Sequence, residues 1–227
     1  MNVRPTALAT AVACVMTLGA ADARAQSTSV PDRIEVGGGV RWSGGQTFPA
    51  ADATETTPTG SAFRLFTATT ALNSTTSFDV HVGVRVWRRV DAQVSLAYGT
   101  PQLRISIAND AESGVPVTAT ERLQEYSVRG GATWSLGAFR TSRLAPFVAM
   151  ELGQVRQLHE GETLIQTGTS VEVGGGARYP LMVRSGRRFR EIGARVDARA
   201  VMRPKRVAVD DKQHTVAAMG VSLYTRF

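Results

Sequence analysis

The stretch REIGARVDARAVMR, Arg190 to Arg203, separates into two kinds of side chain when every second residue is taken. One set is apolar throughout and runs from Ile192 to Met202. The other set carries the charges, among them Arg195, Asp197 and Arg199. A period of two residues is typical of a β-strand whose faces meet different surroundings. Whether the charged face meets solvent or an enclosed interior distinguishes a soluble β-protein from a membrane barrel.

The same alternation recurs along the rest of the chain, in segments separated by clusters of Gly, Pro, Asp, Asn and Ser. No helical periodicity is visible after residue 30. The expected strands are 33–42, 78–87, 91–99, 125–134, 146–153, 170–181, 191–202 and 215–227. Each is near the roughly 9 to 11 residues that a tilted strand needs to cross a bilayer, and long and short connections alternate between them. The sequence therefore predicts an all-β fold, an antiparallel up-and-down eight-stranded transmembrane β-barrel.

Two further segments have strand-like composition. The segment FRLFTATTAL, 63–72, is expected to belong to a structured first loop, either as a protruding hairpin or tucked over the barrel mouth. A ten-stranded barrel is the alternative if 63–72 pairs into the barrel. The segment LRISI, 103–107, is expected to continue the strand 91–99 beyond a β-bulge.

The N-terminus has the features of an export signal. A cation at Arg4, an apolar stretch and the small-x-small motif Ala23-Arg24-Ala25 predict a secretory signal peptide over 1–25, cleaved after Ala25. A short segment, 26–31, would then precede a barrel domain over 32–227. The only cysteine, Cys14, lies in the signal, so the mature chain is expected to have no disulfide and no metal site, and no cofactor is expected.

Composition narrows the class of protein further. The 227 residues carry a net charge of +7 and are 43% hydrophobic, yet no apolar run of about 20 residues follows the N-terminus, which excludes a helical membrane protein. The basic charge alone suggests nucleic acid, but export removes the chain from that partner. We expect no nucleic-acid partner.

The two strand faces differ in ways that favour a membrane barrel over an apolar soluble core. Aromatic residues lie near both ends of the outward faces, as at the two interfaces of a membrane. The predicted interface aromatics are Trp42, Phe78, Tyr98 and Tyr126 at the long-loop end and Trp134, Tyr179 and Phe227 at the short-turn end. The opposite face carries charges of both signs in near balance, as an enclosed lumen requires. The predicted lumen-lining charge network is Glu35, Arg41, Asp79, His81, Arg85, Glu125, Arg129, Glu151, Glu172, Arg178, Arg195, Asp197, Arg199 and Arg226.

The ending MGVSLYTRF, 219–227, is an alternating strand closed by an aromatic C-terminal residue. With it, the chain resembles the small eight-stranded outer-membrane β-barrels of Gram-negative bacteria, the porin-like family similar to the transmembrane domain of outer membrane protein A. The resemblance implies that Gly220, Leu223 and Phe227 form the signal read by the barrel-assembly machinery. Thr225 stands where a second apolar residue is common. The resemblance also implies residence in the cell outer membrane, with membrane lipid as a partner.

The sequence supports three functional hypotheses. The first, which we prefer, is a non-enzymatic, monomeric barrel with a polar, salt-bridged lumen and a structural or surface-interaction role in the cell envelope. The alternative is a narrow channel for small solutes or ions. The second alternative is a lipid-modifying enzyme at the rim, but no serine is evidently placed beside His159 or His214 to form a triad.

Overall fold

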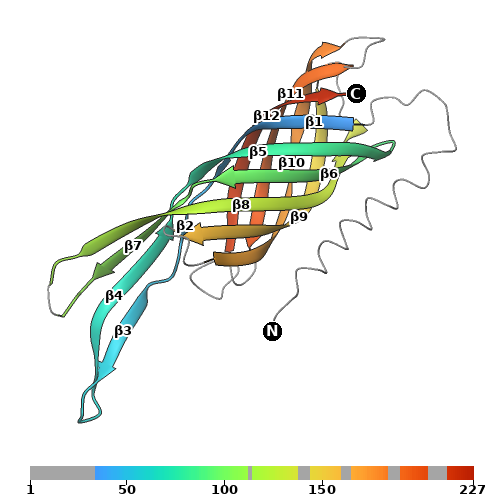
Figure 1. Cartoon of the computed structure of the whole chain (residues 1–227). Helices are drawn as coiled ribbons and strands as arrows, with labels where there is room; N and C mark the ends of the chain where they lie inside the picture. The colour runs from blue at the N-terminus through green and yellow to red at the C-terminus, as the bar shows by residue number, and fades with distance from the viewer. Residues whose placement is uncertain (1–33, 112–113, 138–143, 160–164, 184–189, 204–213) are drawn as a thin grey trace. The chain divides into compact units, whose positions relative to one another are not determined.

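Eight strands close into an antiparallel barrel. The computed structural model describes residues 34–111, 114–137, 144–159, 165–183, 190–203 and 214–227 (Figure 1). The barrel strands are β1 (Ile34–Ser43), β5 (Thr75–Trp87), β6 (Val90–Gly99), β8 (Val117–Ser135), β9 (Ala145–His159), β10 (Ile165–Val183), β11 (Glu191–Arg203) and β12 (His214–Arg226). Each pairs with its neighbour in chain order, β1 pairs with β12, and β8 pairs with β9, which completes the ring. The predicted eight-stranded barrel is confirmed.

Four more strands form an extension beyond the long-loop end of the barrel (Figure 1). They are β2 (Gln46–Thr47), β3 (Ala51–Thr56), β4 (Ala62–Leu72) and β7 (Gln102–Ala108). β4 pairs with β2, β3 and β7, and β7 pairs with the first residues of β8. Because 62–72 does not pair with a barrel strand, the ten-stranded alternative is wrong and the protruding hairpin is right.

The segment 103–107 does not continue β6 through a bulge. β6 ends at Gly99, and the chain passes through the fully buried Pro101 before β7 begins at Gln102. Proline cannot donate a ladder hydrogen bond, so it interrupts the strand here. β7 then follows β8 without a change of register, since Gly99 lies opposite Glu125 and Gln102 opposite Arg122. The expected continuation is therefore a separate strand.

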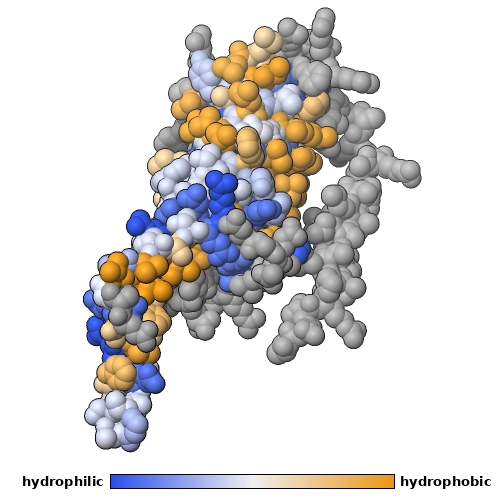
Figure 2. Space-filling model, turned by 60° about the vertical axis from the view of Figure 1, so that its left-hand side comes forward, coloured by the Kyte–Doolittle hydropathy of each residue, from blue (hydrophilic) through white to orange (hydrophobic). Residues whose placement is uncertain are grey.

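The barrel wall is apolar outside. Valines 80, 82 and 84 of β5 are 44 to 51% exposed, and Met150, Leu152 and Met219 are 54 to 59% exposed on other strands. The space-filling view shows this apolar surface over the barrel (Figure 2). A band of this size and continuity indicates contact with lipid rather than water. The described residues contain no helix that is long and apolar enough to cross a membrane.

The polarity of the two faces changes along the 19 residues of β8. From Tyr126 to Trp134 the outward side chains are apolar or aromatic, whereas before Tyr126 they are Thr118, Thr120, Arg122 and Gln124. The opposite parity is mixed before Tyr126, with Val117, Ala119, Glu121 and the buried Leu123, and polar after it, with Ser127 and Arg129. The change near Tyr126 therefore marks the edge of the apolar band.

Candidate functional site

The barrel interior is an ion-pair network, and its first centre is the buried carboxylate of Glu35, which is 4% exposed. Arg226 donates to Glu35 Oε2 from Nη2 at 2.7 Å and from Nε at 2.9 Å. Arg178 Nε lies 3.0 Å from Oε2, and Arg195 Nη1 lies 3.4 Å from Oε1. His81 Nε2 lies 3.4 Å from Oε1. Side chains from four other strands thus converge on one carboxylate of β1.

The ring of Phe147 packs against two guanidinium groups of this centre. It is 1% exposed, and its ring centroid lies 4.7 Å from the Arg178 guanidinium carbon and 4.5 Å from that of Arg195. Cation–π contacts of this kind stabilise desolvated guanidinium groups. Sequence reasoning missed Phe147, although its odd position in 146–153 gives it the inward parity of Glu151.

The second centre lies around Glu172 and Glu151. Glu172 accepts ion pairs from Arg41 at 2.9 Å and from Arg129 and Arg199 at 3.3 Å each. Glu151 pairs with Arg199 at 2.6 Å and with Arg129 at 3.3 Å. Two carboxylates and three guanidinium groups therefore share their charge within one buried cluster.

Asp197 connects the two centres. Its Oδ1 accepts from Arg199 Nε at 2.7 Å, and its Oδ2 lies 3.4 Å from Arg195 Nε. Asp79 adds a further ion pair to Arg129. Because Arg195 also contacts Glu35, the Asp197 bridge makes one continuous network along the lumen.

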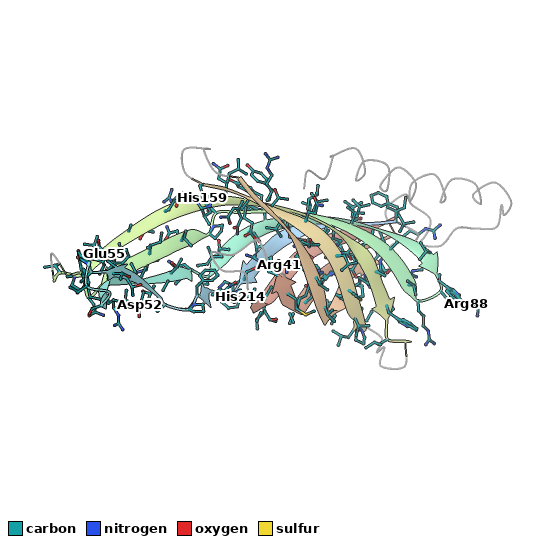
Figure 3. The ribbon with its side chains drawn as sticks, turned by 90° about the horizontal axis from the view of Figure 1, so that it is seen from below. Arg41, Asp52, Glu55, Arg88, His159 and His214 are labelled. Atoms are coloured by element: carbon teal, nitrogen blue, oxygen red, sulfur yellow. The ribbon has the colours of Figure 1, made fainter. Side chains whose placement is uncertain are left out.

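The ends of the network are less enclosed. At the short-turn end Arg85 donates to Asp91 at 2.5 Å, and at the long-loop end Arg203 donates to Glu125 at 2.9 Å. Gln157 donates to the other oxygen of Glu125 at 2.6 Å. Each charged residue of the predicted network thus forms at least one ion pair inside the barrel, and Asp91 and Arg203 join it. Figure 3 shows Arg41 within the barrel and Arg88 at its far end.

Some of the ion pairs in the lumen are close enough for electrostatic attraction but do not have the geometry of a hydrogen bond. His81 Nε2, Arg129 Nε and Arg195 Nε lie 3.3 to 3.4 Å from carboxylate oxygens but have no hydrogen-bond partner. Glycine makes room for one of them, because a Cβ on Gly37 would lie 2.4 Å from His81 Cε1. Close packing rather than ideal geometry determines these contacts.

Two small cavities lie between charged side chains of the described residues. One cavity, lined by Arg41, His81, Asp197 and others, has a volume of about 20 Å³. A second, lined by Ala97, Glu125, Arg129 and others, has about 30 Å³. A single water needs roughly 10 to 15 Å³ on this measure. These two cavities would each hold about one to three waters.

Buried apolar side chains lie at the long-loop end of the interior. They are Phe48, Leu103, Leu123, Val155 and Val201, each 2 to 6% exposed. Phe48 also meets the ring of His214 edge-on, with 5.3 Å between ring centroids. The sequence analysis did not predict this group, because it identified the lumen-facing positions by their charges and these side chains are apolar.

The predicted interface aromatics are exposed on the outer face of the barrel. Phe78, Tyr98 and Tyr126 lie opposite one another across β5, β6 and β8, and the rings of Tyr98 and Tyr126 are 4.9 Å apart. Trp42 lies at the same end, and Trp134, Tyr179 and Phe227 lie at the short-turn end, 38 to 56% exposed. Trp87, which the prediction omitted, is 74% exposed there, beyond a register shift that follows Arg85.

The C-terminal strand closes the barrel against β1. Leu223 is 61% exposed, Gly220 lies next to Asp197 on the inner face, and the Phe227 N–H donates to the Ile34 carbonyl at 3.0 Å. The expected signal peptide, 1–25, and the segment 26–31 lie outside the described residues.

The three histidines lie on β5, β9 and β12, no two of which are neighbours in the barrel. His159 Nδ1 pairs with Glu121 at 2.9 Å at the long-loop end. His81 is enclosed with Glu35, and His214 packs against Phe48. The histidines are therefore dispersed rather than gathered into one site.

A closed eight-stranded barrel with an apolar outside and an ion-paired inside is the architecture of a small outer-membrane β-barrel. No protein-family model and no curated protein sequence matches the chain. Among solved structures, OprG, an outer membrane protein from Pseudomonas aeruginosa, is similar with a TM-score of 0.50 at 9% identity, over 86% of this chain and 96% of that one.

Two other solved structures are similar at lower scores. They are Neisserial surface protein A, with a TM-score of 0.47 at 14% identity over 85% of this chain and 95% of that one, and Ail of Yersinia pestis, with 0.43 at 11% over 87% and 100%. At such identities the likeness to OprG shows the fold alone. The chain has the fold of the small outer-membrane β-barrels.

Proposed function

We propose that the protein resides in the outer membrane of a Gram-negative cell envelope as a sealed, non-enzymatic barrel that holds its extension at the cell surface. Its role is then structural or one of surface interaction. The observation that carries this proposal is the interior: ion pairs connect Glu35 through Asp197 to Glu172, and the cavities beside them measure about 20 and 30 Å³. A lumen filled in this way supports a scaffold rather than a path for solutes.

The proposal includes two partners. Membrane lipid meets the outward face, whose apolar band ends in aromatic residues at both strand ends. The barrel-assembly machinery reads the C-terminal strand through Gly220, Leu223 and Phe227. The barrel is complete within one chain, because β8 and β9 close the ring, and we propose a monomer.

Conductance in planar bilayers tests the sealed lumen. The purified protein should insert without a steady conductance step. The single variants Arg195→Ala and Asp197→Ala remove side chains that link the two centres, and Arg88→Ala, at the exposed short turn, is the matched control. A steady conductance of the unmodified protein that changes in the lumen variants and not in the control would show a channel instead.

A further inference from the structure

Three arginines on the outer face differ from every arginine of the lumen network. Arg104 on β7, Arg122 on β8 and Arg156 on β9 are exposed. None of them forms an ion pair with a carboxylate of the described residues. The carboxylates closest along β8, Glu121 and Glu125, have the opposite parity and contact His159 and Arg203. We call Arg104, Arg122 and Arg156 the outer basic patch.

Strand register places the outer basic patch on three adjacent strands. Arg156 lies opposite Tyr126, Arg122 opposite Gln102, and Arg104 opposite Thr120. Arg156, level with Tyr126, lies four residues along β8 from Arg122, roughly 14 Å away at the backbone. Arg104 and Arg122 are diagonal neighbours, roughly 7 to 8 Å apart at their backbones. Like charges at this spacing repel one another unless an anion lies between them.

The patch lies just beyond the edge of the apolar band. Tyr126, whose ring packs on Tyr98, ends the band on β8, and Val128 and Leu152 continue it toward the short turns. Figure 2 shows hydrophilic surface between the apolar barrel and the extension. Exposed tyrosines at the end of an apolar band lie at the depth of lipid headgroups. The guanidinium groups of the patch, next to Tyr126 or further toward the extension, can therefore reach that depth.

We propose that the outer basic patch binds the phosphate groups of phosphorylated glycolipid in the outer leaflet. Guanidinium groups bind phosphate through paired, charge-assisted hydrogen bonds. Gln124, Gln154 and Thr120 are exposed on the same face and supply donors and acceptors for sugar hydroxyls. A soluble acidic protein is the less favourable occupant, because it would have to displace lipid to reach the level of Tyr126. This inference assumes the membrane location proposed above.

Native mass spectrometry of the full chain in zwitterionic detergent tests the proposal, with bisphosphorylated lipid A as the probe. Arg122→Gln/Arg156→Gln should weaken lipid retention by about tenfold to thirtyfold, since each basic residue near a membrane surface contributes on the order of 1 kcal/mol. The control is Arg88→Gln/Arg89→Gln, which removes the same charge from two exposed arginines at the short-turn end and should retain the lipid.

Three results would overturn the proposal. One is an equal loss in both double variants, which would indicate general charge attraction. Another is equal retention of dephosphorylated lipid A. The third is displacement of the lipid by millimolar inorganic phosphate or by polyglutamate, which would indicate a site for soluble anions. Heat-modifiable migration of each variant on a gel shows independently whether the barrel has formed, so failure of the barrel and failure of the lipid site are distinguishable.

Discussion

Glu35 is a buried carboxylate on which three arginines and His81 converge. Arg226, Arg178 and Arg195 reach it from three strands, and it is itself 4% exposed. Removing one partner of a buried ion pair leaves an uncompensated charge, which costs more than the pair contributes. Each of these arginines has a second carboxylate partner, but Glu35 is the one that all three share.

Glu35→Gln should lower the free energy of unfolding by about 3 to 5 kcal/mol, because three guanidinium groups lose their shared charge. Urea-induced unfolding in lipid vesicles, followed by tryptophan fluorescence, measures the change. Glu125→Gln is the matched control, since it leaves a single arginine, Arg203, without its carboxylate and should cost less. Equal costs at the two positions would contradict the convergence on Glu35.

Val82 tests the outward face in the same assay. It lies midway between Phe78 and Val86 on β5 and is 48% exposed. Val82→Arg should cost about 2 to 4 kcal/mol, as expected for a cation at the bilayer midplane. Val86→Arg, near the short turn, should cost about 0 to 1 kcal/mol. A cost that does not depend on depth would show that this face does not meet lipid.

At the scale of elements, the β3–β4 hairpin is separate from the barrel in its pairing. β4 pairs with β2, β3 and β7, and of these strands only β7 pairs with a barrel strand, β8. The barrel neighbours of β5 are β1 and β6, whose registers run the length of those strands. Barrel closure therefore does not require the hairpin tip.

Replacing Ala51–Ala68 by Asn-Gly should leave a folded barrel. Ala51 lies opposite Ala68, so a two-residue turn can join the strands at this register while keeping Phe48. Heat-modifiable migration on a gel should be retained. Loss of the shift would show that the hairpin is part of the barrel's folding unit.

The last strand allows a second test at this scale. If Phe227 carries the assembly signal, Phe227→Ala should reduce the amount of protein in the outer-membrane fraction of cells, with less effect on refolding in vitro. Phe63→Ala, a change of an exposed phenylalanine on the extension, is the control. Equal outer-membrane levels of the two variants would argue against the signal.

At the scale of the whole molecule, strand alternation predicted part of the structure and not the rest. The eight barrel strands and the inward parity of their charges follow from a period of two residues, because the pleat sends neighbouring side chains to opposite faces. The parity of Phe147 and Tyr224 agrees with their burial in the lumen, although the predicted network of charges left Phe147 out. Alternation did not reveal that β8 runs for 19 residues. Parity indicates the face of a residue, but not whether that face is still beside lipid.

What the sequence alone determined is the set of barrel strands, their two faces and the class of fold, since these follow from neighbours along the chain. The tertiary structure decided which charges meet. Glu35 and Arg226 are separated by 191 positions, and only pairing of β1 with β12 brings them together. It also decided that β4 pairs with β7, which follows β6 along β8 after the interruption at Pro101. Contacts of this kind depend on ring closure, which no local pattern encodes.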